Sequence, residues 1–163
     1  MTSPPRLERR YAIAGAASPG ELDAARRLFR EYADWLGVDL CFQGFDEELA
    51  TLPGKYAPPD GRLLLAHDGA VAVGCIALRR FDATTGEVKR LYVRPAARGQ
   101  GLGDALALQA IEAAREIGYR RLVLDTLEPM TEARSLYGSR GFREIPAYYA
   151  NPLPGAIYMA LQL

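Results

Sequence analysis

The chain has 163 residues with 20 Lys or Arg and 20 Asp or Glu, so its formal net charge is zero. This length suits one domain that buries enough surface to fold without a disulfide or a metal, while the balanced charge argues against a general nucleic-acid binder. The longest apolar run, 70–78, is far shorter than the ~20 residues of a membrane span. Two unpatterned cysteines and one histidine exclude most Cys/His metal frameworks and favour a cytoplasmic protein.

The N-terminal part of the chain predicts one strand and two helices. Residues 11–17 have the pattern of a strand. A helix begins after Ser18, which is the expected N-cap, with Glu21 completing a capping box. Apolar residues three or four apart then continue the helix to Gly37. A second, short helix is expected over 45–52.

The rest of the chain alternates between strands and helices. A hairpin signal at Asp68-Gly69 joins the first two of these strands. The expected strands are 62–67, 70–79, 87–93, 121–126, 142–145 and 156–163, with helices over 102–117 and 130–140. This order predicts an α/β fold over residues 1–163, a single domain in which a mixed sheet carries helices on its faces.

A glycine-rich turn, Arg98-Gly99-Gln100-Gly101-Leu102-Gly103, joins the strand 87–93 to the long helix. Glycine lets the backbone approach a ligand closely, and the free amides at a helix N-terminus favour an anion such as a pyrophosphate. The turn matches neither the GxGxxG pattern of dinucleotide sites nor the GxxxxGK(S/T) pattern of nucleoside-triphosphate sites. It does match RxxGxG. A glycine-rich loop without a ligand is the alternative interpretation.

A second motif lies on the next helix, where residues 133–142 have the pattern AxxLYxxxGF. With both motifs present in this order, the chain resembles the GNAT superfamily of acetyl-CoA-dependent N-acyltransferases. The resemblance implies a GNAT-like single domain with a mixed, mostly antiparallel central sheet and helices on both faces. The matched residues are Arg98, Gly101, Gly103, Ala133, Leu136, Tyr137, Gly141 and Phe142.

The resemblance implies acetyl-CoA as co-substrate and requires no metal. In this family the backbone of the strand before the glycine-rich turn holds the pantetheine arm and the thioester. The cofactor-binding residues expected here are therefore Leu91, Tyr92, Val93, Arg98, Gly99, Gln100, Gly101, Leu102 and Gly103. The segment 87–98 contains four basic residues and one Glu, so we expect the anionic cofactor to dock beside it.

Two catalytic residues follow from the resemblance. Glu87 stands where some family members carry the general base, which must take a proton from an amine that is largely protonated at neutral pH. A solvated carboxylate, or a base that is a water chain, is the alternative. Tyr137 matches the tyrosine that protonates the leaving thiolate in many members, and a core aromatic is its alternative. Strand alternation predicts Glu87, Lys89, Leu91 and Val93 on one face and Val88, Arg90 and Tyr92 on the other.

The acceptor side carries weaker signals. Candidate substrate residues are Phe42, Gln43, Tyr148, Tyr149 and Asn151, with loop packing as the alternative. The expected activity is acetyl transfer to a primary amine of a small molecule or a peptide, by a monomer or a homodimer. The rival hypotheses are a catalytically inactive CoA-binding sensor or regulator, and a nucleotide-binding protein. The sequence leaves open the acceptor and the use of a longer acyl group.

Overall fold

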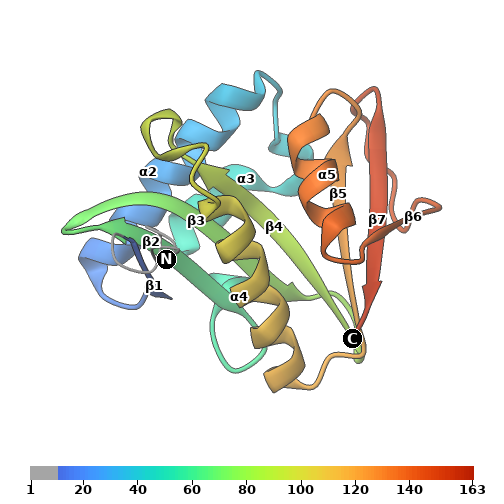
Figure 1. The fold of residues 1–163 in the computed structure, drawn as a ribbon, viewed down its shortest axis with the longest axis horizontal. Helices are drawn as coiled ribbons and strands as arrows, with labels where there is room; N and C mark the ends of the chain where they lie inside the picture. The colour runs from blue at the N-terminus through green and yellow to red at the C-terminus, as the bar shows by residue number, and fades with distance from the viewer. Residues whose placement is uncertain (1–10) are drawn as a thin grey trace, which may run out of the picture.

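A seven-stranded sheet in the order β1-β2-β3-β4-β5-β7-β6 forms the centre of the computed structural model, which describes residues 11–163 (Figure 1). Residues 1–10, which the prediction of a single domain includes, lie outside the described part. The strands are β1 (Tyr11–Gly15), β2 (Arg62–Asp68), β3 (Val71–Arg80), β4 (Thr85–Val93), β5 (Arg121–Leu127), β6 (Arg143–Ile145) and β7 (Ala156–Gln162). The α-helices are α2 (Pro19–Leu36), α3 (Phe45–Thr51), α4 (Leu102–Ile117) and α5 (Thr131–Ser139).

The sheet separates two hydrophobic cores. Helices α4 and α5 cover one face, and α2 and α3 cover the other (Figure 1). Leu106 of α4 packs in the core that includes Ile76, whereas Phe29 of α2 packs in the core that includes Leu65. Neighbouring strands are antiparallel except β4 and β5, which are parallel. The predicted mixed, mostly antiparallel sheet with helices on both faces is confirmed.

The helix ends follow the capping signals in the sequence. The Ser18 hydroxyl accepts a hydrogen bond from the Glu21 N–H at 3.2 Å, and the Glu21 carboxylate accepts one from the Ser18 N–H at 3.0 Å. Gly37 ends α2 and Gly118 ends α4, each in the left-handed conformation that glycine tolerates. The first strand ends at Gly15 rather than at the predicted residue 17.

The predicted alternation along β4 is wrong beyond Lys89, because a bulge interrupts the strand. The pairing with β3 shifts between Cys75 and Ala77, and Arg90 takes a φ of 63°, which is rare for a residue other than glycine. The buried Cys75 thiol donates a hydrogen bond to the Arg90 carbonyl at 3.2 Å. As a result Glu87, Lys89, Arg90 and Tyr92 share the face of α2 and α3, while Val88, Leu91 and Val93 share the face of α4.

Strands β4 and β5 separate soon after they pair. Only Thr85–Glu87 pair with Arg121–Val123, although β4 continues to Val93 and β5 to Leu127. Figure 1 shows the two strands diverging toward the end of the sheet where α5 begins. Beyond these pairs, β4 and β5 are not joined by backbone hydrogen bonds of the sheet.

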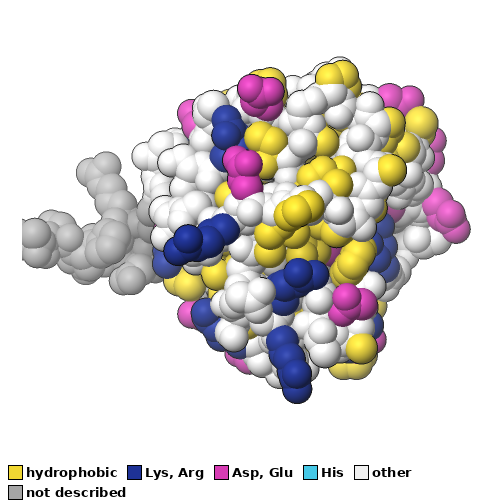
Figure 2. Space-filling view, turned by 90° about the vertical axis from the view of Figure 1, so that its right-hand side faces the viewer, with side chains coloured by type: hydrophobic (Ala, Val, Ile, Leu, Met, Phe, Trp, Pro, Cys, Tyr) yellow, Lys and Arg dark blue, Asp and Glu magenta, His cyan; other side chains and the backbone are white. Residues whose placement is uncertain are grey.

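The surface carries both signs of charge. Figure 2 views the side that lies to the right in Figure 1 and shows basic and acidic side chains distributed among hydrophobic and uncharged ones. This distribution fits the zero net charge of the chain. None of the helices in residues 11–163 is both long enough and apolar enough to span a membrane.

Candidate active site

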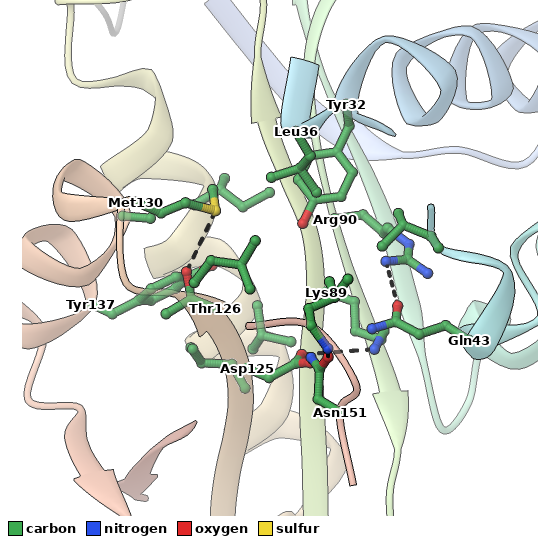
Figure 3. Close-up of a pocket in the computed structure, with 17 residues that line it drawn as sticks. Tyr32, Leu36, Gln43, Lys89, Arg90, Asp125, Thr126, Met130, Tyr137 and Asn151 are labelled. Atoms are coloured by element: carbon green, nitrogen blue, oxygen red, sulfur yellow. Dashed lines mark hydrogen bonds and ion pairs between the residues drawn. The ribbon is translucent and has the colours of Figure 1, made fainter. Parts of the chain in front are cut away.

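The split between β4 and β5 holds two connected concavities. The first, which we call the glycine groove, is lined by Leu91–Val93, by 97–104 except Gln100, and by Trp35, Met130 and the start of α5. The second, the polar pocket, lies between β4 and β5 and is walled by α2, by Leu40 and Gln43, and by Asn151 and Leu153 (Figure 3). Leu91, Met130 and Ala133 line both, so the groove and the pocket share a wall.

The glycine groove brings together nearly all the residues predicted to hold a cofactor. Gly99 and Gly101 have φ values of 76° and 77°, a conformation that glycine adopts without strain. Gly101 is the N-cap of α4 and offers no side chain, so the first amides of that helix are left for an outside acceptor. A Cβ on Gly103 would lie 3.3 Å from Leu136, which keeps this wall close-packed. These features fit a ligand that carries phosphate.

Two predicted residues of the turn are placed differently. The Gln100 side chain does not line the groove; it accepts a hydrogen bond from the Tyr11 hydroxyl at 3.2 Å. The Arg98 side chain folds back along the groove, where Nε donates to the Val93 carbonyl at 2.8 Å. Its guanidinium lies 4.9 Å from the centre of the Trp35 ring.

The four basic residues of segment 87–98 do not all lie beside the glycine-rich turn. Lys89 and Arg90 face the polar pocket rather than the glycine-rich turn. Arg94 forms an ion pair with Glu31 of α2, with an N–O distance of 2.7 Å. Of these four basic residues, only Arg98 has no carboxylate partner among residues 11–163. Arg98 is thus the only one of the four basic side chains that lines the glycine groove, and docking of the cofactor beside this segment stays a prediction.

Opposite charges meet in the polar pocket. The Lys89 ammonium lies 3.7 Å from Glu87 Oε1 and 4.0 Å from Asp125 Oδ1. Asp125 accepts hydrogen bonds on Oδ2 from Asn151 Nδ2, at 2.9 Å, and from the Tyr149 hydroxyl. Burial lowers the pKa of Lys89, although Glu87 and Asp125 oppose that shift. Figure 3 shows Lys89, Asp125 and Asn151 converging between the two strands.

Glu87 lies below this pocket and does not line it. The residue is 1% exposed, and its carboxylate accepts from Arg79 Nε at 2.7 Å and from the Tyr148 hydroxyl at 2.6 Å. Burial would raise the pKa of Glu87, but Lys89, Tyr148 and Arg79 together hold it below its ordinary value. The carboxylate is thus paired and buried, not solvated, and its role as general base stays a prediction.

A second buried ion pair supports the pocket from the side of α3. Arg90 binds Glu48 through Nε and Nη2, at 2.8 and 3.1 Å, and donates from Nη1 to Gln43 at 2.8 Å. Gln43 Nε2 in turn donates to the Tyr149 hydroxyl at 3.2 Å, which links this pair to Asp125. Burial alone would raise the pKa of Glu48, but Arg90 keeps it lowered.

The remaining predicted residues divide between the pocket and its support. Tyr137 lines the pocket, and burial raises the pKa of its hydroxyl. Gln43 and Asn151 also line it. Tyr148 and Tyr149 do not line it but hold the carboxylates of Glu87 and Asp125. Phe42 packs in the core under α2 and does not reach the pocket.

Sequence reasoning missed several residues of the site. Trp35 and Tyr32 come from α2, where their helical spacing gave no sign of a ligand. Asp125 directly follows the apolar run Leu122-Val123-Leu124 within a strand. A carboxylate next to such a run could have been recognised from the sequence as a candidate site residue. Among the described residues, no three or more His, Cys, Asp or Glu side chains are grouped so that they could hold a metal ion.

Comparisons with known proteins agree on one family. The model of the acetyltransferase (GNAT) family matches residues 23–142. The chain is 42% identical over 154 residues to an uncharacterized N-acetyltransferase of Schizosaccharomyces pombe, with 93% of this chain and 94% of that protein covered. It is 27% identical to the crystal structure of a putative acyl-CoA N-acyltransferase from Klebsiella pneumoniae, with a TM-score of 0.74 and coverage of 94% and 97%. An acetyltransferase structure from Streptococcus agalactiae gives a TM-score of 0.79 at 23% identity, with coverage of 95% and 99%.

Proposed function

The chain belongs to the GNAT family of acetyltransferases, and we propose that it transfers the acetyl group of acetyl-CoA directly to a primary amine of a small molecule or peptide. The observation that carries this proposal is the junction of the two concavities. Leu91, Met130 and Ala133 form a wall common to the glycine groove and the polar pocket. A thioester entering from the groove and an amine entering from the pocket would meet at that wall.

The glycine groove suits the donor. The uncapped amides of α4 and the left-handed glycines before it favour the pyrophosphate of CoA. Apolar side chains at Leu91, Val93 and Leu136 suit the less polar pantetheine arm along the rest of the groove. Acetyl-CoA supplies the thioester, and this chain holds and orients it.

In the proposed reaction, the amine nitrogen forms a bond to the thioester carbonyl carbon and the carbon–sulfur bond breaks. The products are an amide and a thiol, and the ammonium form of the acceptor gives up one further proton. We assign Tyr137 to protonate the departing sulfur. Because burial raises the pKa of its hydroxyl, Tyr137 stays protonated at neutral pH and is ready to donate.

The proton on the acceptor nitrogen needs a different group. Asp125 is the one carboxylate among residues 11–163 that lines the polar pocket, so we assign it to receive the acceptor ammonium and its proton. Glu87 is separated from the pocket by Lys89, whose ammonium lies 3.7 Å from Glu87 Oε1. We therefore propose that Glu87 acts through Lys89, as a positioning residue.

Thiol release from acetyl-CoA, measured with and without added amines, tests this function. Trp35 is the only tryptophan of the chain and lies in the groove, so its fluorescence reports cofactor binding independently. We expect CoA to change that fluorescence, ATP and NAD to leave it unchanged, and thiol release to require an amine. A fluorescence response to CoA without thiol release, across amino acids, polyamines and peptides, would instead identify a non-catalytic CoA-binding module.

A further inference from the structure

Lys89 presents an ammonium with unused hydrogen-bonding capacity to the polar pocket. Its side chain is only 6% exposed, and its two carboxylate neighbours lie at 3.7 and 4.0 Å, beyond hydrogen-bond distance. Lys89 makes no hydrogen bond to any residue in 11–163, although an ammonium has three donors and buried donors are normally satisfied. The free donors therefore face the pocket, where a ligand can accept from them.

Asp125 offers the matching acceptor beside it. Both hydrogen bonds to this carboxylate, from Tyr149 and Asn151, end on Oδ2. Oδ1 faces Lys89 at 4.0 Å and accepts no hydrogen bond from the described residues. The floor of the pocket thus holds a positive and a negative group side by side, each with capacity for a partner.

Taking the proposed acetyl transfer as its basis, we propose that the acceptor is a free α-amino acid, bound with its carboxylate on Lys89 and its amine on Asp125. The ammonium and carboxylate of an α-amino acid are attached to the same carbon, so their charges lie as close together as those of Lys89 and Asp125. With its carboxylate toward Lys89 and its ammonium toward Asp125, the zwitterion can bind both groups at once. A polyamine or a simple alkyl amine would leave the hydrogen-bond donors of the buried Lys89 ammonium without an acceptor, which is costly.

The rest of the pocket points to an apolar amino-acid side chain. Leu36, Leu40 and Leu153 form walls away from the charged floor. The other cation of the pocket, Arg90, is already engaged by Glu48 and Gln43 through three of its nitrogens. Because the charge of Arg90 is already paired with Glu48, an acidic side chain gains little from it, and leucine, methionine and phenylalanine fit better than aspartate or glutamate.

Matched acceptors that differ only in the carboxylate test the proposal. Leucine is compared with 3-methylbutylamine, methionine with 3-(methylthio)propylamine and phenylalanine with 2-phenylethylamine, in the thiol-release assay at saturating acetyl-CoA. Since a hydrogen bond to a charged group is worth about 1.5–3 kcal/mol, kcat/KM should be about 10–100-fold higher for each amino acid than for its amine. Equal values within each pair would overturn the proposal while leaving amine acetylation intact.

Lys89→Met removes the charge and keeps the length of the side chain. We expect the advantage of each amino acid over its matched amine to disappear, mainly through a higher KM for the amino acid. Lys55→Met is the matched control, because Lys55 and Lys89 are the two lysines of the chain and Lys55 lies outside the pocket. A Lys89→Met variant that keeps the preference, or loses activity equally on both acceptors, would overturn the assignment.

Binding can be followed without turnover, which keeps the proposal testable if the variant fails to fold. Wild-type protein labelled with ¹³C-lysine has two Cε signals, one from Lys55 and one from Lys89. With CoA bound, leucine should shift the Lys89 signal and leave Lys55 unmoved, whereas 3-methylbutylamine should shift neither strongly. An unmoved Lys89 signal at saturating leucine would overturn the proposal. A shifted signal without acetylation of any acceptor would instead refute the transfer reaction and retain the amino-acid site.

Discussion

The glycine groove and the polar pocket lie end to end in one split of the sheet, yet they are built in opposite ways. The groove is lined mainly by one continuous stretch, the end of β4 through the first turn of α4. The pocket is lined by side chains from separate parts of the chain, and its charged and polar groups come from α2, Gln43, β4, β5, α5 and Asn151. Its groups depend on one another, since Gln43 and Tyr149 link the ion pair of Arg90 to Asp125.

This difference predicts how the two regions fail. A groove that uses backbone amides tolerates most side-chain changes and is damaged where a substitution alters the backbone itself. A pocket that relies on buried ion pairs is damaged whenever one charge loses its partner. Substitutions in one region should therefore leave binding in the other largely intact.

The largest effect is expected from Glu48→Gln. Arg90 and Glu48 are 2% and 3% exposed, and removing one partner of a buried ion pair costs about 3–5 kcal/mol. Urea unfolding should show this loss, while the Trp35 response to CoA is retained because the groove lies elsewhere. Asp23→Asn, which breaks the exposed pair with Arg26, is the control and should change stability by less than about 1 kcal/mol. If Glu48→Gln lowered the free energy of unfolding by less than about 1 kcal/mol, as the control does, the pocket would not depend on the pairing of its buried charges.

Tyr137→Phe tests the junction of the two regions. If Tyr137 protonates the departing sulfur, its loss should lower kcat by about 100-fold with little change in the KM for acetyl-CoA. Tyr119→Phe is the control, because the Tyr119 hydroxyl donates to the Asp60 carbonyl at a distant site and should not affect kcat. An unchanged kcat in Tyr137→Phe would assign this ring to packing against Phe142.

Gly101→Val should damage the groove selectively. A β-branched residue at a φ of 77° is strained by about 1–2 kcal/mol. We expect CoA affinity, measured by Trp35 fluorescence, to fall about tenfold because the backbone turn and its amides are displaced. Gly20→Ala, in an open position of α2 without a positive φ, serves as the control. Unchanged affinity in Gly101→Val would show that the left-handed turn is not needed for the cofactor.

The smallest effect, a displaced pH profile, is expected from Glu87→Gln. Burial lowers the pKa of Lys89, and the Glu87 charge opposes this shift. Without that charge the pKa falls further, Lys89 loses its proton at lower pH, and the alkaline limb of kcat/KM for an amino acid moves to lower pH. If Glu87 were the direct base, the substitution would instead remove the acid limb and abolish most activity across the whole profile.

The same contrast explains what could be predicted from the sequence. The groove was predictable because its residues are close in the chain and its glycines are required by backbone geometry. Gln100 was predicted to bind the cofactor but does not line the groove. The motif places its backbone in the turn, and nothing in the motif shows that its side chain contacts Tyr11 instead.

The pocket was less predictable because its geometry depends on a bulge and on distant partners. Arg90 has a left-handed backbone conformation, and beyond it the side chains of β4 lie on the opposite faces to those that simple alternation predicts. No local sequence pattern indicates this conformation at an arginine. Lys89 and Asp125 belong to different strands that meet only through the fold. In the aromatic-polar cluster after β6, Asn151 lines the pocket, whereas Tyr148 and Tyr149 donate hydrogen bonds to the carboxylates of Glu87 and Asp125; a role of the cluster in substrate binding stays a prediction.

Only three residue pairs join β4 to β5, and this bears on how readily the protein unfolds. They join a sheet half made of β1–β4 to a half made of β5, β7 and β6. A cofactor in the glycine groove would contact β4 on one side and Met130 and α5, which follow β5, on the other, and so would link the two halves. A ligand that binds only the folded chain stabilises it by about 2.7 kcal/mol at a hundred times its Kd. The resistance of this protein to unfolding, and hence to proteolysis, should therefore rise and fall with the supply of acetyl-CoA.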